Sequence, residues 1–330
     1  MLFSLKAINP LLRDITSMNY PPFNDTLDVV VIIRLFMAKR ITVRAPCRID
    51  LAGGWTDVPN FCRSKSGEVV NIAINKYTRC IMELDDERKI TLSYSTDMPT
   101  GSGLGTSGSM NVGLIGTILG SEFEPTEIAE IAYQFEALLG NKGGRQDQWA
   151  SALGGINHLS FNGEKVAIKS LNPSTEFISL LEDRLLLFNS MISHVSGQLH
   201  QNIWDRYAND DSGIVLALDK IRDAGLLMAK AISEESITII AESFKIVMGA
   251  VDQLGMELHD PFRTIIQPYT NSGEVLAWKA MGAGGGGVVG VLLSEHCDRQ
   301  KIIIDFTTQG WKNIDWKMDK QGLQREAITL

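Results

Sequence analysis

The chain has 330 residues, of which 44% are hydrophobic and 21% charged, so it can bury a sizeable core as one large domain or two packed ones. Its formal net charge of −8 disfavours nucleic acid or an anionic membrane as the main partner. The four cysteines, at 47, 62, 80 and 297, form no CxxC pair and no zinc spacing, and no apolar run approaches the length of a membrane span. These features predict a cytoplasmic protein with reduced thiols.

Residues 1–36 have no sustained hydrophobic period, so we expect them to lie outside the fold, or the true start to be at Met37. Strands are expected at 41–45, 48–52, 69–74, 78–84 and 89–95. Two helices are expected after them, at 107–119 and 126–139. Their predicted apolar faces are Met110, Leu114, Ile118 and Leu119, widened by Val112 and Ile115, and then Ile128, Ile131, Phe135, Leu138 and Leu139.

A short helix is expected to carry residues 146–149 and to stop at 154–155. Strands near 156–161, 165–170 and 185–190 follow, and then helices at about 197–208, 212–232, 236–254 and 260–270. The chain is expected to end with strands near 275–280, 287–293 and 313–318 around a helix near 296–308. The composition shifts near residue 190, which predicts two packed α+β domains, 37–190 and 191–330.

One glycine-rich stretch stands out, because Gly101, Gly103 and Gly105 run straight into Thr106 and Ser107 at an expected helix start. Such a loop presents unpaired backbone N–H groups and the positive end of the helix dipole, which suits phosphate. The alternative is an ordinary glycine turn capped by a hydroxyl. Two further glycine-rich stretches, at 52–55 and 282–287, favour the interpretation that backbone groups bind a polyanion. The chain has no Gly-Lys dipeptide and therefore no P-loop, and the glycine spacing does not fit a dinucleotide fold.

Phosphoryl transfer also needs a metal ligand and a group that orients or deprotonates the acceptor hydroxyl. Glu136 adjoins an expected apolar helix face, although it could equally be a solvated or salt-bridged helix residue. Asp147 lies in a short glycine-bounded segment, where the alternative is a helix cap. Asp57 can accept two hydroxyl hydrogen bonds and therefore suits a polyol. Trp55 could lie against a sugar ring, or simply belong to the core.

Three stretches together, residues 44–57, 99–109 and 281–287, resemble the three motifs of the galactokinase, homoserine kinase, mevalonate kinase and phosphomevalonate kinase (GHMP) superfamily. The three motifs occur in the order and at the spacing of the superfamily, and the resemblance covers roughly residues 38–330. The resemblance implies an N-terminal α+β ATP-binding domain with a left-handed βαβ element, and a ferredoxin-like C-terminal domain.

The resemblance also implies site residues. Asp147 would orient or deprotonate the acceptor hydroxyl, Arg48 would stabilise charge near it, and Ser107 would ligate Mg²⁺ with Glu136. The residues implied to bind ATP are Pro99, Gly101, Ser102, Gly103, Leu104, Gly105, Thr106, Ser107 and Ser109. Those implied on the substrate side are Gly54, Trp55, Asp57, Asp147, His194, Gly284, Gly285 and Gly286. For His194 the alternative is a capped surface histidine.

Residues 52–57 and 143–148 are most similar to the branch that holds D-glycero-D-manno-heptose 7-phosphate kinase and L-fucokinase, which phosphorylate an anomeric hydroxyl. The implied partner is a small sugar or sugar phosphate, with ATP and Mg²⁺ as cofactors, no nucleic acid or membrane, and a homodimer left open. A heptose 7-phosphate is the leading acceptor, with fucose or another hexose second. Arg63 and Lys65 would grip the heptose phosphate, unless they are solvated loop charges. A non-catalytic ATP- and sugar-binding sensor is the remaining alternative.

Overall fold

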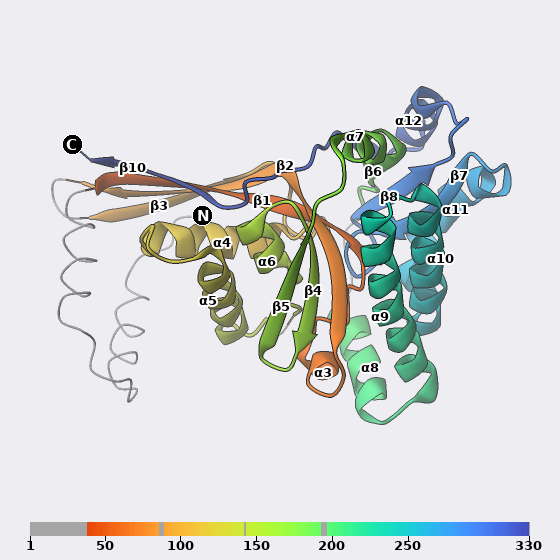
Figure 1. Ribbon diagram of the computed structural model, residues 1–330, viewed down its shortest axis with the longest axis horizontal. Coiled ribbons are helices and arrows are strands. Elements are labelled where there is room, and N and C mark those ends of the chain that lie inside the picture. Colours follow the sequence, from red (N-terminus) through yellow and green to blue (C-terminus); the bar gives the residue numbers. More distant parts are fainter. Residues whose placement is uncertain (1–37, 86–88, 142, 193–196, 330) are drawn as a thin grey trace.

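The computed structural model describes residues 38–85, 89–141, 143–192 and 197–329, and these form an α+β fold built on two antiparallel sheets (Figure 1). The expectation for residues 1–36, and the site prediction for His194, lie outside the described residues.

The first sheet has the strand order β10-β1-β2-β4-β5, with β3 also paired to β2. Its strands are β1 (Ala38–Ala52), β2 (Gly67–Leu84), β3 (Ile90–Thr96), β4 (Ile156–Asn162), β5 (Lys165–Leu171) and β10 (Gln324–Thr329). β4 pairs with the first part of β2 and β3 with its second part, so the sheet branches along β2. A short helix, α3 (Pro59–Cys62), lies in the β1–β2 connection.

Two pairs of expected strands are each one long strand in the structure. The expected strands 41–45 and 48–52 are both part of β1, and 69–74 and 78–84 are both part of β2. The register between β1 and β2 shifts at Pro46/Cys47, opposite residues 74–77. Such a bulge interrupts the alternation of apolar and polar residues and bends the strand, but it does not end it. The sequence therefore suggested two strands where the structure has one.

Three helices cover one face of the first sheet: α4 (Thr106–Ile118), α5 (Pro125–Leu138) and α6 (Gln146–Leu153) (Figure 1). The predicted apolar face of α4 is correct only in part. Val112 and Ile115 are buried as predicted, but Ile118 is exposed, and the rest of the buried side includes Gly113 and Gly116. A Cβ at Gly116 would lie 3.3 Å from Val43 Cγ1, so small residues allow the helix to sit close to β1.

The predicted apolar face of α5 is also largely wrong. Leu138 and Leu139 are 79% and 70% exposed, and Ile131 is exposed as well. Ile128 is buried as expected, but the rest of the buried side is Ala129, Ala132, Tyr133 and Glu136. The helix is therefore rotated so that Glu136, and not Leu138 or Leu139, faces the protein.

The second sheet has the order β7-β8-β6-β9. Its strands are β6 (Leu185–Asn189), β7 (Val275–Ala280), β8 (Val288–Leu293) and β9 (Lys312–Ile314), and α7 (Thr175–Arg184), α11 (Asp260–Asn271) and α12 (Arg299–Thr308) pack near it. The helix α7 and the strand β10 were not expected from the sequence, and the strand expected at 313–318 is only the short β9. Ser174 caps α7 by accepting a hydrogen bond from the backbone of Phe177.

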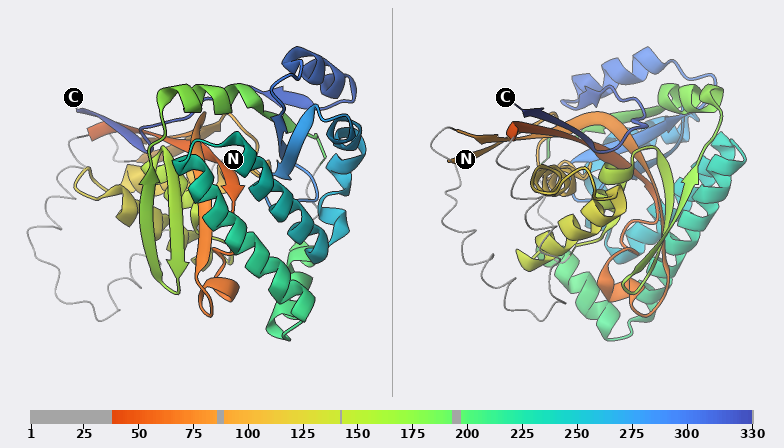
Figure 2. Two further views of the ribbon diagram at one scale, coloured as in Figure 1. Left: turned by 45° about the vertical axis from the view of Figure 1, so that its right-hand side comes forward. Right: turned by 60° about the vertical axis from the view of Figure 1, so that its left-hand side comes forward.

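The helices α8 (Gly197–Ala208), α9 (Ser212–Ser233) and α10 (Ile237–Leu254) follow β6, and a 3₁₀ turn at Met256–Leu258 leads into α11. α9 packs on β1 and β2 while α10 packs on β7, and Figures 1 and 2 show this helix pair running side by side. The pair therefore joins the two sheets in one core. Among the described residues, no helix combines the length and the apolar character needed to cross a membrane.

Candidate active site

Arg48, near the end of β1, and Asp147, in the first turn of α6, form an ion pair. Arg48 Nε and Nη2 lie 2.8 and 2.7 Å from Asp147 Oδ1. Arg48 Nη1 donates to the carbonyl oxygens of Gly103 (2.6 Å) and Met281 (2.9 Å). Burial alone would lower the pKa of Arg48, but the carboxylates of Asp147 and Asp50 raise it above its usual value. One charged guanidinium therefore links the second glycine-rich segment, and the residue just before the third, to Asp147.

Asp147 does not cap its helix. The N-cap of α6 is Arg145, and no side chain there closes a capping hydrogen bond. The Asp147 side chain is 28% exposed, whereas that of Arg48 is 7% exposed. A carboxylate that is oriented by a buried guanidinium and still reached by solvent can accept a proton from an incoming hydroxyl.

The loop before α4 has the backbone expected of a phosphate cradle. Gly101, Gly103 and Gly105 have φ values of 77°, 84° and 70°, in the left-handed region where side chains are disfavoured. Gly105 is the N-cap of α4, and a Cβ there would lie 3.2 Å from Asp147 Cγ. The first N–H groups of α4 therefore start beside the predicted catalytic carboxylate.

Several side chains implied to bind ATP face the protein interior. Ser109 is fully buried, and its hydroxyl lies 2.7 Å from that of Thr78. Leu104 is fully buried, and Ser102 Oγ lies 3.3 Å from Thr106 Oγ1. These residues shape the loop, so any contact they make with phosphate would come from the main chain.

Glu136, on α5, is 8% exposed and accepts four hydrogen bonds. Its Oε1 accepts from Ser107 Oγ (3.1 Å) and Asn141 Nδ2 (2.5 Å). Its Oε2 accepts from Asn111 Nδ2 (2.9 Å) and Gln148 Nε2 (2.6 Å). Glu136 is therefore neither solvated nor salt-bridged. It is held beside the one exposed hydroxyl at the start of α4.

Asp57 follows the first glycine turn and is 2% exposed. Its Oδ2 accepts a hydrogen bond at 2.9 Å from the backbone N–H of Gln146, the residue before Asp147. The pKa of Asp57 is raised to about 6, mainly by burial and also by the charges of Asp147 and Asp50. The hydrogen bond from Gln146 acts in the opposite direction.

This raised pKa predicts a pH-dependent stability. In the unfolded chain an aspartate has a pKa near 3.9. Between about pH 4 and about pH 6, Asp57 is therefore ionised in the unfolded state while it still holds its proton in the folded state. The free energy of unfolding consequently falls as the pH rises through this range. Asp57→Asn removes that cost. The free energy of unfolding of the variant, minus that of the wild type, should therefore grow by roughly 3 kcal/mol from pH 4 to pH 7.

Urea unfolding of both proteins at a series of pH values measures this difference. A difference that stays constant across the range would show that Asp57 is already ionised in the folded protein at low pH.

The third glycine-rich segment packs on the second. A Cβ at Gly103 would lie 2.9 Å from the backbone nitrogen of Gly282, and the N–H of Val288 donates to the carbonyl of Ser102 at 2.8 Å. The predicted substrate residues in this segment, Gly284, Gly285 and Gly286, contact other backbone instead: Gly285 N–H donates to Leu258 O at 2.7 Å, and a Cβ at Gly284 or Gly286 would meet Leu258 O or Ile192 O.

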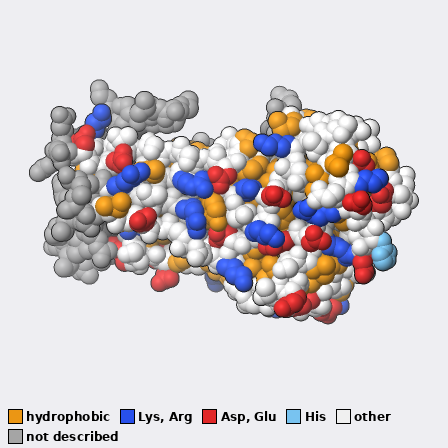
Figure 3. All heavy atoms as spheres, turned by 90° about the horizontal axis from the view of Figure 1, so that it is seen from above, with side chains coloured by type: hydrophobic (Ala, Val, Ile, Leu, Met, Phe, Trp, Pro, Cys, Tyr) orange, Lys and Arg blue, Asp and Glu red, His pale blue; other side chains and the backbone are white. Residues whose placement is uncertain are grey.

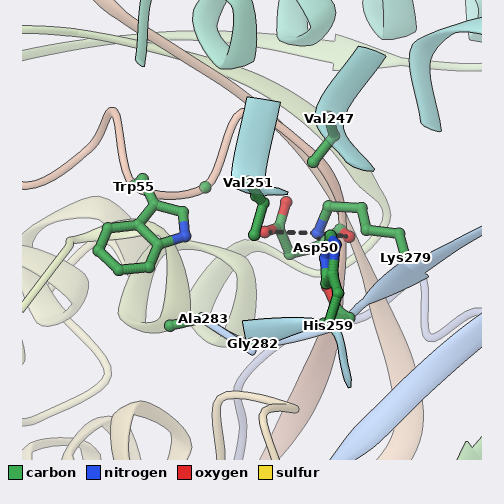
Figure 4. Close-up of a pocket in the computed structure, with 10 residues that line it drawn as sticks. Asp50, Trp55, Val247, Val251, His259, Lys279, Gly282 and Ala283 are labelled. Atoms are coloured by element: carbon green, nitrogen blue, oxygen red, sulfur yellow. Dashed lines mark hydrogen bonds and ion pairs between the residues drawn. The ribbon is translucent and has the colours of Figure 1, made fainter. Parts of the chain in front are cut away.

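Trp55 has a φ of 82°, an unusual backbone conformation for a bulky residue. Its ring lies 4.8 Å from that of His200 and 5.9 Å from that of Trp204, measured between centroids, so it packs on α8. Its half-buried side chain also lines a small pocket with Asp50 and Lys279, drawn in Figure 4. Trp55 thus belongs partly to the core and partly to a pocket wall.

Lys279, at the end of β7, was not expected from the sequence to take part in the site. It is 3% exposed, and its Nζ lies 2.9 Å from Asp50 Oδ2. Asp50 shares a strand face with Arg48, two residues away, and Lys279 lies three residues before Gly282, where the third glycine-rich segment begins. In the sequence, the ion pair of Lys279 with Asp50 was indicated only by the presence of a lysine shortly before the third glycine-rich segment.

The prediction that Arg63 and Lys65 form a phosphate grip is not supported by their contacts. Lys65 Nζ lies 2.6 Å from Asp219 Oδ2, and Arg63 Nη2 lies 3.5 Å from Glu164 Oε1. Each cation already has a carboxylate partner.

Comparison with known proteins agrees with this geometry. Residues 69–155, from β2 to the end of α6, match the GHMP kinases N terminal domain. This stretch is therefore a GHMP kinase N-terminal domain. The named proteins to which the chain is similar are kinases.

Among GHMP kinases, a Campylobacter jejuni D-glycero-alpha-D-manno-heptose 7-phosphate kinase is 27% identical over 307 residues, covering 76% of this chain and 88% of that protein. A bifunctional fucokinase/GDP-fucose pyrophosphorylase of Arabidopsis thaliana is 22% identical over 333 residues, which is 81% of this chain but only 31% of that protein. The fold is shared with a D-glycero-D-manno-heptose 1-phosphate kinase from Bacteroides thetaiotaomicron (TM-score 0.70, 17% identity, 88% of this chain and all of that one).

Proposed function

We propose that this protein is a GHMP kinase that transfers the γ-phosphoryl group of ATP to the anomeric hydroxyl of a small sugar. The observation that carries the proposal is the Arg48–Asp147 pair beside the start of α4. Asp147 accepts or orients the hydroxyl proton, and Arg48 holds that carboxylate in place and balances the charge that develops nearby. An intact base and guanidinium argue against a non-catalytic sensor.

The triphosphate would lie along residues 99–109, where backbone N–H groups and the helix dipole favour anions. A pocket of about 300 Å³ adjoins the start of this loop and is lined by Lys76, Asp97, Pro99, Asn189 and Lys312, among others. Its position supports a place for the nucleotide base, at the opposite end of the loop from Asp147.

We propose that Mg²⁺ is held by Glu136 and Ser107 together with phosphate oxygens of ATP. The described residues contain no cluster of three or more His, Cys, Asp or Glu side chains suited to a metal ion. One carboxylate and one hydroxyl beside a phosphate loop nevertheless fit Mg²⁺, which is usually bound through one or two carboxylates plus substrate phosphates. When bound, the ion would neutralise phosphate charge during transfer.

Ser107→Ala and Glu136→Gln should each raise the Mg²⁺ concentration needed for half-maximal rate, by roughly tenfold, because each removes an oxygen ligand. The measurement is a Mg²⁺ titration at fixed ATP. Ser179→Ala, at an exposed serine on α7, is the matched control and should titrate like the wild type. Unchanged titrations in both site variants would remove these residues from the metal site.

Two acceptors are supported by different observations. The heptose 7-phosphate kinase relative supports D-glycero-D-manno-heptose 7-phosphate. L-Fucose is supported by the fucokinase relative and by the carboxylate partners of Arg63 and Lys65. A coupled ADP-release assay over a panel of sugars and sugar phosphates tests the proposal, and absence of sugar-dependent ADP release would refute it.

Surface features support a cytoplasmic enzyme of small molecules without a nucleic-acid or membrane partner. On the face in Figure 3, basic and acidic side chains are interspersed. The cysteines at 47, 62, 80 and 297 are all free. Whether the enzyme is a homodimer is tested by its mass in solution.

A further inference from the structure

The strands β1 and β7 belong to different sheets, yet two side chains join their ends. Arg48 of β1 donates from Nη1 to the carbonyl oxygen of Met281 at 2.9 Å, just past the end of β7. Lys279 of β7 donates from Nζ to the carbonyl oxygen of Asp50 on β1, also at 2.9 Å. Each strand therefore sends a cation to the main chain of the other, and the two contacts lie two residues apart along both chain segments.

The lysine contact is buried, and all of its donors are used. The side chains of Lys279 and Asp50 are 4% and 6% exposed, and Nζ lies 2.9 Å from Asp50 Oδ2, as Figure 4 shows. Nζ also donates to Ala280 O at 2.9 Å, so all three of its protons have acceptors. An ammonium with three fixed acceptors holds the end of β7 in one position against β1.

The main chain that Lys279 anchors carries a carbonyl group that orients Arg48. Ala280 O is bonded to Lys279 Nζ, and the next residue, Met281, supplies one of the two main-chain acceptors of Arg48 Nη1. The other acceptor, Gly103 O, belongs to the nucleotide loop. The orientation of the guanidinium therefore depends on where the second sheet holds Met281.

The guanidinium of Arg48 passes this placement on to Asp147. Its Nε and Nη2 lie 2.8 and 2.7 Å from Asp147 Oδ1, while Nη1 is held by the two carbonyl groups. Because a guanidinium is planar and rigid, a shift of the Met281 carbonyl turns the whole group and moves the nitrogens that hold Asp147. A displacement of a catalytic group by about 1 Å is enough to slow a reaction strongly.

Stability alone does not account for the buried pair of Lys279 and Asp50. Taking two charges out of water costs more than their attraction returns, unless further hydrogen bonds satisfy the remaining polar groups. Asp50 Oδ1 has no hydrogen-bond donor in the described part of the chain. The pair is therefore better explained by where it holds β7 than by what it adds to the free energy of unfolding.

We propose, on the basis of the proposed sugar kinase function, that Lys279 is a positioning residue for phosphoryl transfer. Through Asp50, it holds the end of β7 against β1. The Met281 carbonyl then keeps Arg48 in the orientation that presents Asp147 to the acceptor hydroxyl. The second sheet thereby takes part in catalysis through its main chain.

The test measures ADP release by variants of the full chain with the best acceptor from the sugar panel. Lys279→Met removes the ammonium and should lower kcat by roughly tenfold to a hundredfold, the cost expected for a displaced catalytic group. The KM for ATP should stay within about threefold of the wild type. The reason is that the three acceptors of Lys279 lie outside the nucleotide loop.

A double variant separates positioning from stability. Lys279→Met leaves the charge of Asp50 buried without a partner, so it should also lose stability. Asp50→Asn combined with Lys279→Met removes both charges and should unfold closer to the wild type, but its kcat should stay low, because the link between β7 and β1 is still missing. A lysine that only stabilised the fold would give a variant whose kcat recovers together with its stability.

Lys317→Met is the matched control. It breaks another lysine–carboxylate pair between distant segments, in which Lys317 Nζ lies 2.8 Å from Glu182 Oε2 on α7. This variant should keep the kcat of the wild type.

A spectroscopic readout follows Arg48 itself and needs no acceptor. Its Nε–H donates to Asp147 at a buried position, so exchange of this proton with solvent, followed by NMR of the guanidinium nitrogen, should be slow in the wild type. It should be at least roughly tenfold faster in Lys279→Met and in the double variant, because the guanidinium is no longer held by Met281.

A kcat within about threefold of the wild type in both variants would overturn the inference. So would a rise in the KM for ATP larger than the fall in kcat, which would place the effect on the nucleotide loop. If no acceptor supports ADP release, the proposed function fails instead, and the exchange rate alone decides. Faster exchange at Arg48 in the double variant then supports the positioning role of Lys279, and unchanged exchange overturns it.

Discussion

Asp147→Asn is expected to lower kcat by roughly 10²–10⁴-fold, the usual size of a lost acid–base or orienting group. The amide keeps the shape of the side chain and can still accept hydrogen bonds from Arg48, which lies 2.7–2.8 Å from Asp147 Oδ1. It cannot take the proton of the acceptor hydroxyl, and it no longer offsets the guanidinium charge. The fold and ATP binding should remain.

The measurement is kcat from ADP release, with ATP affinity determined separately. Asp223→Asn is a suitable control, because Asp223 also pairs with an arginine, Arg222, but on the exposed side of α9. It should leave kcat unchanged. A near-normal kcat in Asp147→Asn would show that the aspartate only supports the loop, and the proposed mechanism would be wrong.

Much of the fold could be predicted from hydrophobic periodicity and glycine positions. The helices α4, α5, α9 and α10 begin and end within a few residues of their expected limits, because each has a long periodic pattern with clear end signals. The short elements were harder. β10 is a single edge strand paired with β1, and its pairing depends on contacts nearly 300 residues apart in the chain.

The buried faces of α4 and α5 could not be derived from residue size alone. Gly113 and Gly116 mark the side of α4 that approaches the sheet, while the larger Ile118 is exposed. On α5, Glu136 takes a buried position because four donors surround it. Close approach and polar satisfaction outweigh aliphatic burial at both places, and both lie beside the site.

The sequence motifs predicted which residues form the candidate site, but they did not predict which charged side chains form ion pairs there. Arg48, Asp147, Ser107 and Glu136 come together in two contacting pairs. The pairing of Lys279 with Asp50 spans 229 residues, and that of Lys65 with Asp219 spans 154. No local pattern reports contacts of this range, so these charge pairs had to come from the structure.

The close packing of α4 on α6 leads to the second large expected effect. Gly108 lies in the first turn of α4, and a Cβ there would be 2.5 Å from Asp147 Cβ and 3.2 Å from both Asp147 C and Gln148 N. These atoms belong to or adjoin the main chain of α6, so they cannot move aside as a flexible side-chain end could. One of the two helices must shift.

Gly108→Ala should therefore lower kcat by about 10²-fold, the cost expected when a catalytic group is displaced by about 1 Å, although no polar atom is changed. Helix propensity works in the opposite direction, because alanine is favoured over glycine inside a helix by about 1 kcal/mol. Gly249→Ala separates the two effects, since a Cβ at this glycine in α10 meets nothing within 4 Å. It should keep kcat and gain stability by about 0.5–1 kcal/mol. ADP-release kinetics and thermal unfolding of both variants provide the comparison. A Gly108→Ala enzyme with kcat within a few-fold of the wild type would show that Asp147 tolerates displacement, and that its exact distance from the start of α4 does not limit the reaction.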